Sequence, residues 1–304
     1  MFGDDLGNQV VRYGGPVATH RLLAFTSNAS EDPMASSSSS DSLRICHDLF
    51  ATSKLVPFIG AGLSARFNIP SWSQLIDLIA NELGWDAEVF KLSGTFLQLA
   101  EYYVAVKGSI GPLRSKMDKL FNPADDQILA SKSHMKLVDL GFPLIYTTNF
   151  DEIIERSFKL RGKVFRTIAS IDDIKEAPSD VAQIVKFHGT FSDDKSLVVT
   201  ETNYFDRLDF ESPLDIKLRA DMLGKSLLFI GYSFSDLNIR LMLYKLSKLR
   251  REHKLSERLP TAIMTSFGPT EVERELLAKW DVLIVELDPI DRDRSMDGLW
   301  EKLG

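Results

Sequence analysis

The chain has 304 residues, 44% of them hydrophobic, with a formal net charge of −7 and a pI near 5.4. These values predict a globular protein with ample material for a core, as one large domain or two modest ones. The acidic balance argues against direct nucleic-acid binding, which depends on clustered Lys and Arg. A basic run is the main exception, and we expect it to be the solvated end of a helix. It contains Lys245, Lys248, Arg250, Arg251 and Lys254.

The sequence gives no sign of a membrane anchor or of export. No apolar stretch approaches the roughly 20 residues that cross a bilayer, and no apolar run near the N-terminus would serve as a secretory signal. A cytoplasmic location is therefore expected. The single cysteine, Cys46, excludes an internal disulfide and a zinc site built from cysteine pairs. Because Cys46 lies on an apolar stripe with no basic neighbour, we expect it to be buried as a small hydrophobe.

Residues 1–42 differ from the rest of the chain. The serine run 36–40 is of low complexity, which predicts a disordered N-terminal segment. Met34 offers an alternative translation start inside this segment. An amphipathic helical pattern over 42–53 then leads into an apolar run of strand length over 55–59.

This apolar run ends in the glycine loop Gly60-Ala61-Gly62-Leu63-Ser64. Glycine lets an anion approach the main chain closely, and a helix that begins here would add free N–H groups and a positive end. The loop therefore indicates either a phosphate site or a tight strand-to-helix turn that binds nothing. The spacing fits the loose dinucleotide fingerprint, which requires an acidic residue about 20 positions further on, at the end of a second strand. Glu82 has that separation but ends a helical pattern over 72–83, so this requirement is poorly met.

Helical and strand-like patterns alternate along the remainder. Helical patterns over 95–106, 109–120 and 133–140 predict a helical insertion at about 86–140. Further apolar runs of strand length follow, at 142–146, 183–187, 197–200, 226–230, 261–265 and 282–287. This alternation predicts an α/β fold for residues 43–304, with a Rossmann-like parallel sheet covered by helices on both faces.

Polar segments follow four of these strands, which places them at the edge where ligands bind in parallel sheets. They are 60–64, 147–151, His188-Gly189 and 231–235. One such coincidence would mean little, but four predict a site of nucleotide size.

Together these segments resemble the sirtuin family, most closely its bacterial branch of NAD-consuming domains in anti-phage defence. Gly60-Ala61-Gly62-Leu63-Ser64 resembles the cofactor loop Gly-Ala-Gly-x-Ser, and Thr147-Thr-Asn-Phe-Asp151 resembles Thr-Gln-Asn-hydrophobic-Asp. His188-Gly189 is similar to the catalytic His-Gly, and Gly231-Tyr-Ser233 stands where the family has Gly-Thr-Ser. The four motifs keep the family's order, and their joint match is far more specific than any one of them.

Two departures separate the chain from lysine deacylases of that family. The four cysteines of their zinc module are absent, and Ser71-Trp-Ser73 replaces their Asp-Phe-Arg. The resemblance therefore implies cleavage of NAD+ itself, with NAD+ as substrate, no metal, and nicotinamide and ADP-ribose or a cyclised form as products. It also implies self-assembly or a partner, such as a HerA-type ATPase or another defence protein.

The resemblance implies a role for each matching residue. Asn149 would orient the attacking water or the ribose, Asp151 would hold the nicotinamide carboxamide, and His188 would accept a proton near neutral pH. The expected cofactor-binding residues are Gly60, Ala61, Gly62, Ser64, Thr147, Gly231 and Ser233.

The residues alone leave other interpretations open. Asn149 could cap the helix that follows it, His188 could be a hydrogen-bonded turn residue, and Arg66 could reach a phosphate or merely cover a helix. A sensor or assembly subunit that binds NAD or ADP-ribose without turnover is the main alternative, and a deacylase is a weaker one.

Overall fold

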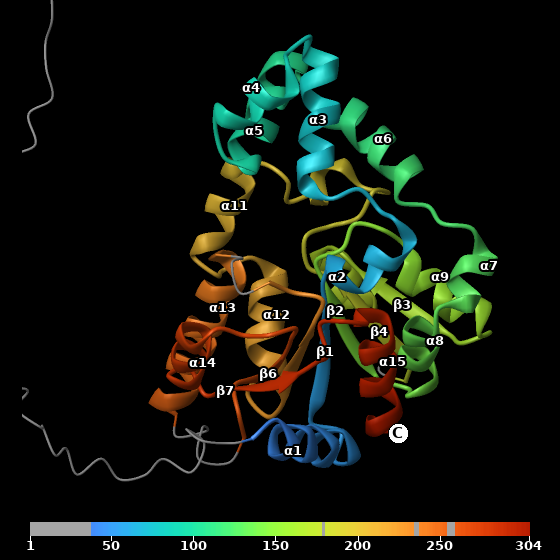
Figure 1. Cartoon of the computed structure of the whole chain (residues 1–304), viewed down its shortest axis with the longest axis vertical. Coiled ribbons are helices and arrows are strands. Elements are labelled where there is room, and N and C mark those ends of the chain that lie inside the picture. The colour runs from blue at the N-terminus through green and yellow to red at the C-terminus, as the bar shows by residue number, and fades with distance from the viewer. Residues whose placement is uncertain (1–37, 178–179, 234–236, 254–258) are drawn as a thin grey trace, which may run out of the picture. The chain divides into compact units, whose positions relative to one another are not determined.

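The computed structural model describes residues 38–177, 180–233, 237–253 and 259–304. Its centre is a seven-stranded parallel sheet in the order β3-β4-β2-β1-β5-β6-β7 (Figure 1). The strands are β1 (Leu55–Ile59), β2 (Leu144–Thr147), β3 (Phe165–Ile168), β4 (Ala182–Lys186), β5 (Ser226–Ile230), β6 (Ala262–Ser266) and β7 (Val282–Glu286). The predicted parallel α/β sheet is confirmed.

Helices cover both faces of this sheet. One face carries α1 (Ser39–Ala51), α8 (Lys132–Asp139), α9 (Ile153–Leu160) and α15 (Arg292–Leu303). The other carries α12 (Pro213–Asp221), α13 (Leu237–Glu252) and α14 (Glu271–Ala278). The remaining helices are α2 (Ala61–Ser64), η1 (Ala65–Phe67), α3 (Trp72–Leu83), α4 (Ala87–Leu92), α5 (Phe96–Lys107), α6 (Gly111–Leu120), α7 (Asp125–Ala130), α10 (Ile171–Glu176), η2 (Asp194–Ser196) and α11 (Glu201–Leu208).

The central strand β1 shows why the layers form. Its five residues are all buried, and alternate side chains reach opposite faces. Leu55 and Ile59 join the core under α1 and α15, whereas Val56 and Phe58 join the core under α12 and α13. A near-continuous apolar run is what a strand buried on both faces requires.

A helical module, defined here as α3 to α6, lies beyond the carboxyl ends of the strands (Figure 1). Its own core includes Ile76, Phe90 and Tyr103, and it also takes in Phe150 and Phe191 from the loops after β2 and β4. Capping boxes at Ser71 and Thr95 begin α3 and α5. The predicted insertion at 86–140 differs from this module, which starts earlier, with α3. Helices α7 and α8 pack instead against α9 and α15.

Several expectations need adjustment. The first helix begins at Ser39, three residues before the predicted start, because Ser38 and Asp41 form a capping box. The predicted disordered segment is otherwise not described, since residues 1–37 lie outside the described part.

The strand predicted at 197–200 is wrong: this stretch pairs with no strand, and Leu197 and Val199 pack into the helical module. Strand β3, which the sequence did not predict, has only one fully buried residue, so it lacks a clear apolar run.

The structure also decides two smaller expectations. Cys46 is fully buried, as predicted, and burial raises the pKa of its thiol to about 12. Arg250 is not the solvated residue that the basic run predicted: it is 1% exposed and donates to the carbonyl oxygens of Met222 and Leu259, each at 2.9 Å. Lys254 lies outside the described residues. Among the helices that the structure describes, none has the length and apolar character to span a bilayer.

Candidate active site at the carboxyl edge of the sheet

The loops after β1, β2, β4 and β5 meet at one edge of the sheet because these four strands are neighbours and run in the same direction. Strand β1 lies in the middle: the chain continues from it to β2, β3 and β4 on one side and then crosses to β5 on the other side. Such a reversal of strand order opens a crevice at the carboxyl ends of the strands. The polar segments singled out in the sequence lie at this edge, the last of them over its described residues 231–233.

Three glycines pack the loops after β1 and β5 directly against each other. A Cβ atom on Gly62 would lie 2.7 Å from the Cα of Gly231, and one on Gly60 would lie 2.7 Å from the Gly231 oxygen. Gly231 itself has a φ of +75°, which side-chain-bearing residues rarely adopt. The glycines are therefore needed for contact between the two loops, which the sequence interpretation did not foresee.

This contact also uses main-chain donors that were expected to hold a diphosphate. Gly60 N donates to Ile230 O at 2.8 Å, and Gly62 N donates to Gly231 O at 3.0 Å. Helix α2 has only four residues, and Gly60 at its N-cap provides no side-chain cap. Ala61 is exposed at the first helical position. The glycine loop thus acts first as a rigid joint between β1 and β5.

The Asn149 side chain is held over the end of β1. Its Nδ2 donates to Ser64 Oγ at 3.1 Å and to Gly60 O at 3.3 Å, and its main-chain N–H donates to Thr147 Oγ1 at 3.0 Å. Asn149 is 6% exposed, and within the described structure its Oδ1 has no hydrogen-bond partner. A buried acceptor without a donor is costly, so this oxygen marks a place where a ligand hydroxyl or water would bind.

Two residues expected to bind cofactor contact Asn149 in the structure. Thr147 is fully buried, and its hydroxyl donates to Ile59 O at 2.9 Å while accepting the Asn149 N–H. Ser64 is 2% exposed, and its hydroxyl bonds with both the Asn149 amide and the Asp151 carboxylate. Both residues therefore hold the segment 147–151, the β2 loop, in place.

Asp151 is almost fully buried at the start of α9, where its Oδ1 accepts the Ile153 N–H at 3.1 Å. Burial raises the pKa of this carboxyl, while the nearby Lys186 ammonium and the Ser64 hydroxyl act in the opposite direction. The neighbouring Phe150 points the other way, into the helical module, with its ring centroid 5.8 Å from that of Phe191. This alternation places Asn149 and Asp151 together on the sheet side.

Lys186 and Glu155 lie behind these residues, and the sequence analysis missed both. Lys186 is 0% exposed, with its Nζ 3.3 Å from Glu155 Oε1 and 2.5 Å from the Asp151 main-chain oxygen. Burial raises the pKa of Glu155, which Lys186 again opposes. The one signal available in the sequence was a lysine at the end of a strand otherwise expected to be buried.

His188 leaves the sheet beside the β2 loop. Thr147 pairs with Lys186, and Phe187 N donates to Thr147 O at 2.7 Å, so the chain after β4 runs next to the Asn149 segment. His188 is 8% exposed and packs between the rings of Phe187 and Tyr204. Burial, with a smaller effect of Arg207, lowers the pKa of His188 to about 3, well below the value near 6.5 that the sequence interpretation assumed. We call Ser64, Asn149, Asp151, Glu155, Lys186 and His188 the β2–β4 site.

An open cleft of about 610 Å³ lies on the other side of β1. Its walls come from the loops after β1, β5, β6 and β7, and we call it the β5–β7 cleft. Of the residues expected to bind cofactor, Gly62, Gly231 and Ser233 line it, and Gly60, Ala61, Ser64 and Thr147 do not. Its other lining residues include Arg66, Phe267 and Asp293. A cleft of this size can hold a large part of a nucleotide.

Tyr232 stands between the β2–β4 site and the cleft. Its hydroxyl donates to Ile59 O at 3.1 Å and lies 2.7 Å from Thr148 Oγ1, while its ring packs on Phe58 and Phe229. The ring occupies the space that a Cβ atom on Gly60 would need. Tyr232 thereby ties together the loops after β1, β2 and β5.

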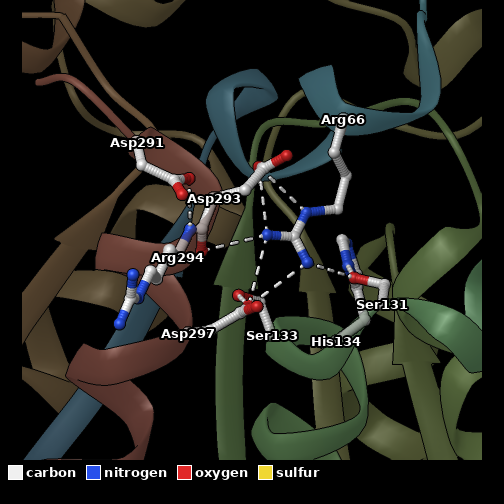
Figure 2. Close-up of polar contacts among 8 residues, drawn as sticks. All are labelled: Arg66, Ser131, Ser133, His134, Asp291, Asp293, Arg294 and Asp297. Carbon is white, nitrogen blue, oxygen red and sulfur yellow. Dashed lines mark hydrogen bonds and ion pairs between the residues drawn. The ribbon is translucent and has the colours of Figure 1, made fainter.

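Arg66 forms one wall of the cleft and is tied to α15 (Figure 2). Its guanidinium donates to Asp293 Oδ1 at 3.0 Å, to Asp297 Oδ1 at 3.2 Å and to Ser131 Oγ at 2.9 Å. The Ser131 hydroxyl lies 2.8 Å from His134 Nδ1, and burial lowers the pKa of His134 to about 3. Arg66 therefore binds protein carboxylates in this structure and fixes the turn after α2.

No group of three or more potential metal ligands occurs within the described residues. Fold and site together define a Rossmann-like α/β protein with a ligand crevice at the switch point of its sheet.

Comparison with known proteins narrows this class. Residues 143–285 match the model of the SIR2-like domain. It is 31% identical over 241 residues to "Defense-associated sirtuin 2" of Bacillus subtilis, covering 75% of this chain and 22% of that protein. It is 30% identical over 200 residues to "NAD(+) hydrolase ThsA" of Enterococcus faecium, covering 65% of this chain and 41% of that protein. The chain thus spans less than half the length of either relative.

Among solved structures, a Sir2 homologue in complex with NAD is similar, with a TM-score of 0.44 and 14% sequence identity. The match covers 84% of this chain and 92% of that one. The resemblance to the anti-phage branch of sirtuin-like domains, noted from four motifs, is confirmed by the family model and the relatives.

Proposed function

We propose that the protein is an NAD+ hydrolase that releases nicotinamide from NAD+ and acts as an NAD-depleting effector in anti-phage defence. The observation that carries this proposal is the buried, unpartnered Oδ1 of Asn149, whose amide shares the Ser64 hydroxyl with the Asp151 carboxylate. An amide oxygen without a donor is suited to accept from a ribose hydroxyl or an attacking water. The relatives named NAD(+) hydrolase support the same activity.

The proposed reaction suits these groups. Nicotinamide leaves NAD+ as a neutral molecule, and the positive charge passes to the ribose, so the site has to stabilise a cationic sugar. Ionised Asp151 would supply negative charge in a medium of low dielectric, where it acts strongly. The Asn149 amide, fixed by Ser64 and Gly60, would orient the water.

His188 would accept the proton that this water loses. With a pKa of about 3 it is a weak base. A weak base is sufficient if the bond to nicotinamide is largely broken before water attacks, because water bound to a cationic sugar becomes acidic. The products are then nicotinamide and ADP-ribose, or a cyclised form if a hydroxyl of the substrate itself attacks.

We further propose that the remainder of NAD+ binds in the β5–β7 cleft. Gly62, Gly231 and Ser233 line the cleft at its boundary with the β2–β4 site, where the diphosphate would lie. A second, smaller hollow of about 220 Å³ shares Tyr232, Ser233 and Phe267 with the cleft and extends it towards α14. A cytoplasmic location, self-assembly and a HerA-type ATPase partner belong to the same proposal.

Product chromatography tests the proposal. Purified protein, alone and with the product of a neighbouring gene, is incubated with NAD+ beside Asn149→Ala and beside Asn81→Ala, an exposed residue on α3. We expect nicotinamide from the wild type and Asn81→Ala only, with the second product distinguishing hydrolysis from cyclisation. Binding of NAD+ by calorimetry without any release would instead support the sensor alternative, and release by Asn149→Ala would remove Asn149 from the mechanism.

A further inference from the structure

Lys186 is a fully buried charge with no place in the mechanism described so far. Its Nζ contacts Glu155 Oε1 at 3.3 Å and donates to the main-chain oxygen of Asp151 at 2.5 Å. Removing two charges from water costs so much that well-packed apolar residues often replace a buried ion pair without loss of stability. The pair therefore calls for a role beyond stability.

The contacts of Lys186 point to that role. The β2 loop, residues 147–151, is fixed at its start by the Thr147 hydroxyl, which accepts the Asn149 N–H at 3.0 Å. At its end, Lys186 holds the Asp151 carbonyl, while the Asp151 carboxylate accepts the Ile153 N–H. Asn149 lies between these two attachments. Movement of the Asp151 main chain would displace the Asn149 oxygen from its place over β1.

We propose that Lys186 is a positioning residue of the β2–β4 site: anchored by Glu155, its ammonium holds the Asp151 main chain and with it the loop that carries Asn149. The effect on turnover rests on the proposed function, whereas the effect on the loop does not. Glu155 is suited to the role of anchor, because it is 5% exposed and its Oε1 contacts Lys186.

The charges around Asp151 give the ammonium a second effect. The ionisable groups that face Asp151 are Lys186 from β4 and Glu155 from α9, with the Ser64 hydroxyl from α2. Burial favours the neutral form of both carboxyls, and Lys186 opposes this for both. Loss of the ammonium therefore favours protonated Asp151, and any rate that requires ionised Asp151 should then need a higher pH.

The test compares Lys186→Met with the double variant Lys186→Met/Glu155→Leu. The single variant leaves Glu155 buried without its counter-ion and should have the lowest Tm, whereas the double variant removes both charges and should recover most of the Tm. If Lys186 positions the loop, the double variant should still release nicotinamide at least about 10-fold more slowly than wild type. Its KM should stay within about 3-fold, because the β5–β7 cleft is untouched.

A matched control removes another ion pair. Lys91 and Asp77 pair at 2.6 Å in the helical module, away from the site. Lys91→Met/Asp77→Leu should keep the wild-type rate. When the rate of nicotinamide release is plotted against pH, the acid limb should move to higher pH in Lys186→Met. It should keep its wild-type position in this control.

Hydrogen–deuterium exchange of peptides covering the β2 loop provides a measurement that needs no turnover. At equal global stability, these amides should exchange faster in the Lys186→Met/Glu155→Leu variant than in wild type. A wild type that releases no nicotinamide would defeat the proposed function, and the exchange result would still decide the role of Lys186. Recovery of both wild-type Tm and wild-type exchange by the double variant would overturn the proposal, as would recovery of the full rate.

Discussion

The β2–β4 site and the β5–β7 cleft flank the same central strand but are built in opposite ways. In the β2–β4 site, ionisable and amide groups are buried, the pKa values of Asp151, Glu155 and His188 are displaced, and the Asn149 oxygen has no donor. In the cleft, the partly buried guanidinium of the wall is paired: Arg66 binds Asp293 and Asp297. Buried groups with displaced pKa values and an unpartnered acceptor are typical of places where chemistry occurs, whereas satisfied groups around an open volume are typical of binding.

This contrast implies that reaction and binding can be separated by mutation. Changes in the β2–β4 site should lower the rate of nicotinamide release and leave NAD+ binding unchanged. Changes in the cleft should weaken or strengthen NAD+ binding first. The joint between the two, made of Gly60, Gly62, Gly231 and Tyr232, should affect both.

The largest effect is expected for Asp151→Asn. The amide keeps the shape of the side chain but removes the negative charge proposed to stabilise the cationic ribose, so nicotinamide release should fall by about 100-fold or more. The rise in Tm caused by NAD+ should persist, because the cleft is intact. The neighbouring Glu152→Gln removes an exposed carboxylate and should keep the wild-type rate. Equal rates for wild type and Asp151→Asn would place the chemistry elsewhere.

Gly62→Ala should affect both regions. The added Cβ would lie 2.7 Å from the Cα of Gly231, so the two loops have to separate, at a cost of about 1–3 kcal/mol in unfolding free energy. Thermal unfolding should show a lower Tm, and calorimetry should show NAD+ binding weakened several-fold. Gly224 has open space around its Cβ position, and Gly224→Ala provides the control. A normal Tm with weakened binding would instead favour direct contact between this residue and the ligand.

The acid sensitivity of folding provides a test that compares the two regions directly. His134, beside the cleft wall, and His188 both have a pKa lowered to about 3 by burial. The unfolded chain takes up their protons near pH 6.5, whereas the folded protein does so only near pH 3, so stability is present above pH 6.5 and falls as the pH drops below it. Each histidine should contribute up to roughly 1.4 kcal/mol per pH unit in that window.

Urea unfolding between pH 7 and pH 4 measures this slope. His134→Gln and His188→Gln should each make it shallower, and His47→Gln should not, because His47 is exposed. An unchanged slope in His188→Gln would show that this ring is protonated at higher pH than its burial implies, and it would then be a stronger base than proposed.

Much of the fold could be predicted because its signals are local. Buried strands such as β1 and β5 read as continuous apolar runs that end at glycine, and the polar motifs follow them directly. Strand β3 was missed because three of its four residues are only partly buried, so no such run exists. The segment 197–200 was assigned to a strand because its apolar residues match that pattern, although they pack against helices.

The site could be predicted only as far as the motifs extend. The need for glycine at position 62 arises from contact with Gly231, which lies in the loop after another strand, and no local pattern shows it. Ser64 and Thr147 were expected to touch a ligand, but their hydroxyls bind neighbouring residues. In the sequence, Lys186 cannot be distinguished from any other polar residue at the end of a strand, because only the fold brings Glu155 and Asp151 beside it. Such roles depend on contacts between distant segments, which a sequence does not display.

The smallest effect concerns the charge of the cleft wall. Asp293 faces the β5–β7 cleft and pairs with Arg66 at 3.0 Å, and its side chain is 67% exposed. If the diphosphate of NAD+ binds in this cleft, Asp293→Asn removes a repulsive charge and frees part of the Arg66 guanidinium for the phosphates. Because exposed charges interact weakly, calorimetry should show NAD+ binding only about 2- to 5-fold tighter, with the gain shrinking as salt is raised. Asp172→Asn, on exposed α10, should not change the affinity. Weaker binding by Asp293→Asn would mean that this carboxylate accepts hydrogen bonds from a ribose, and the adenosine half of NAD+, not the diphosphate, would then lie against the Arg66 wall.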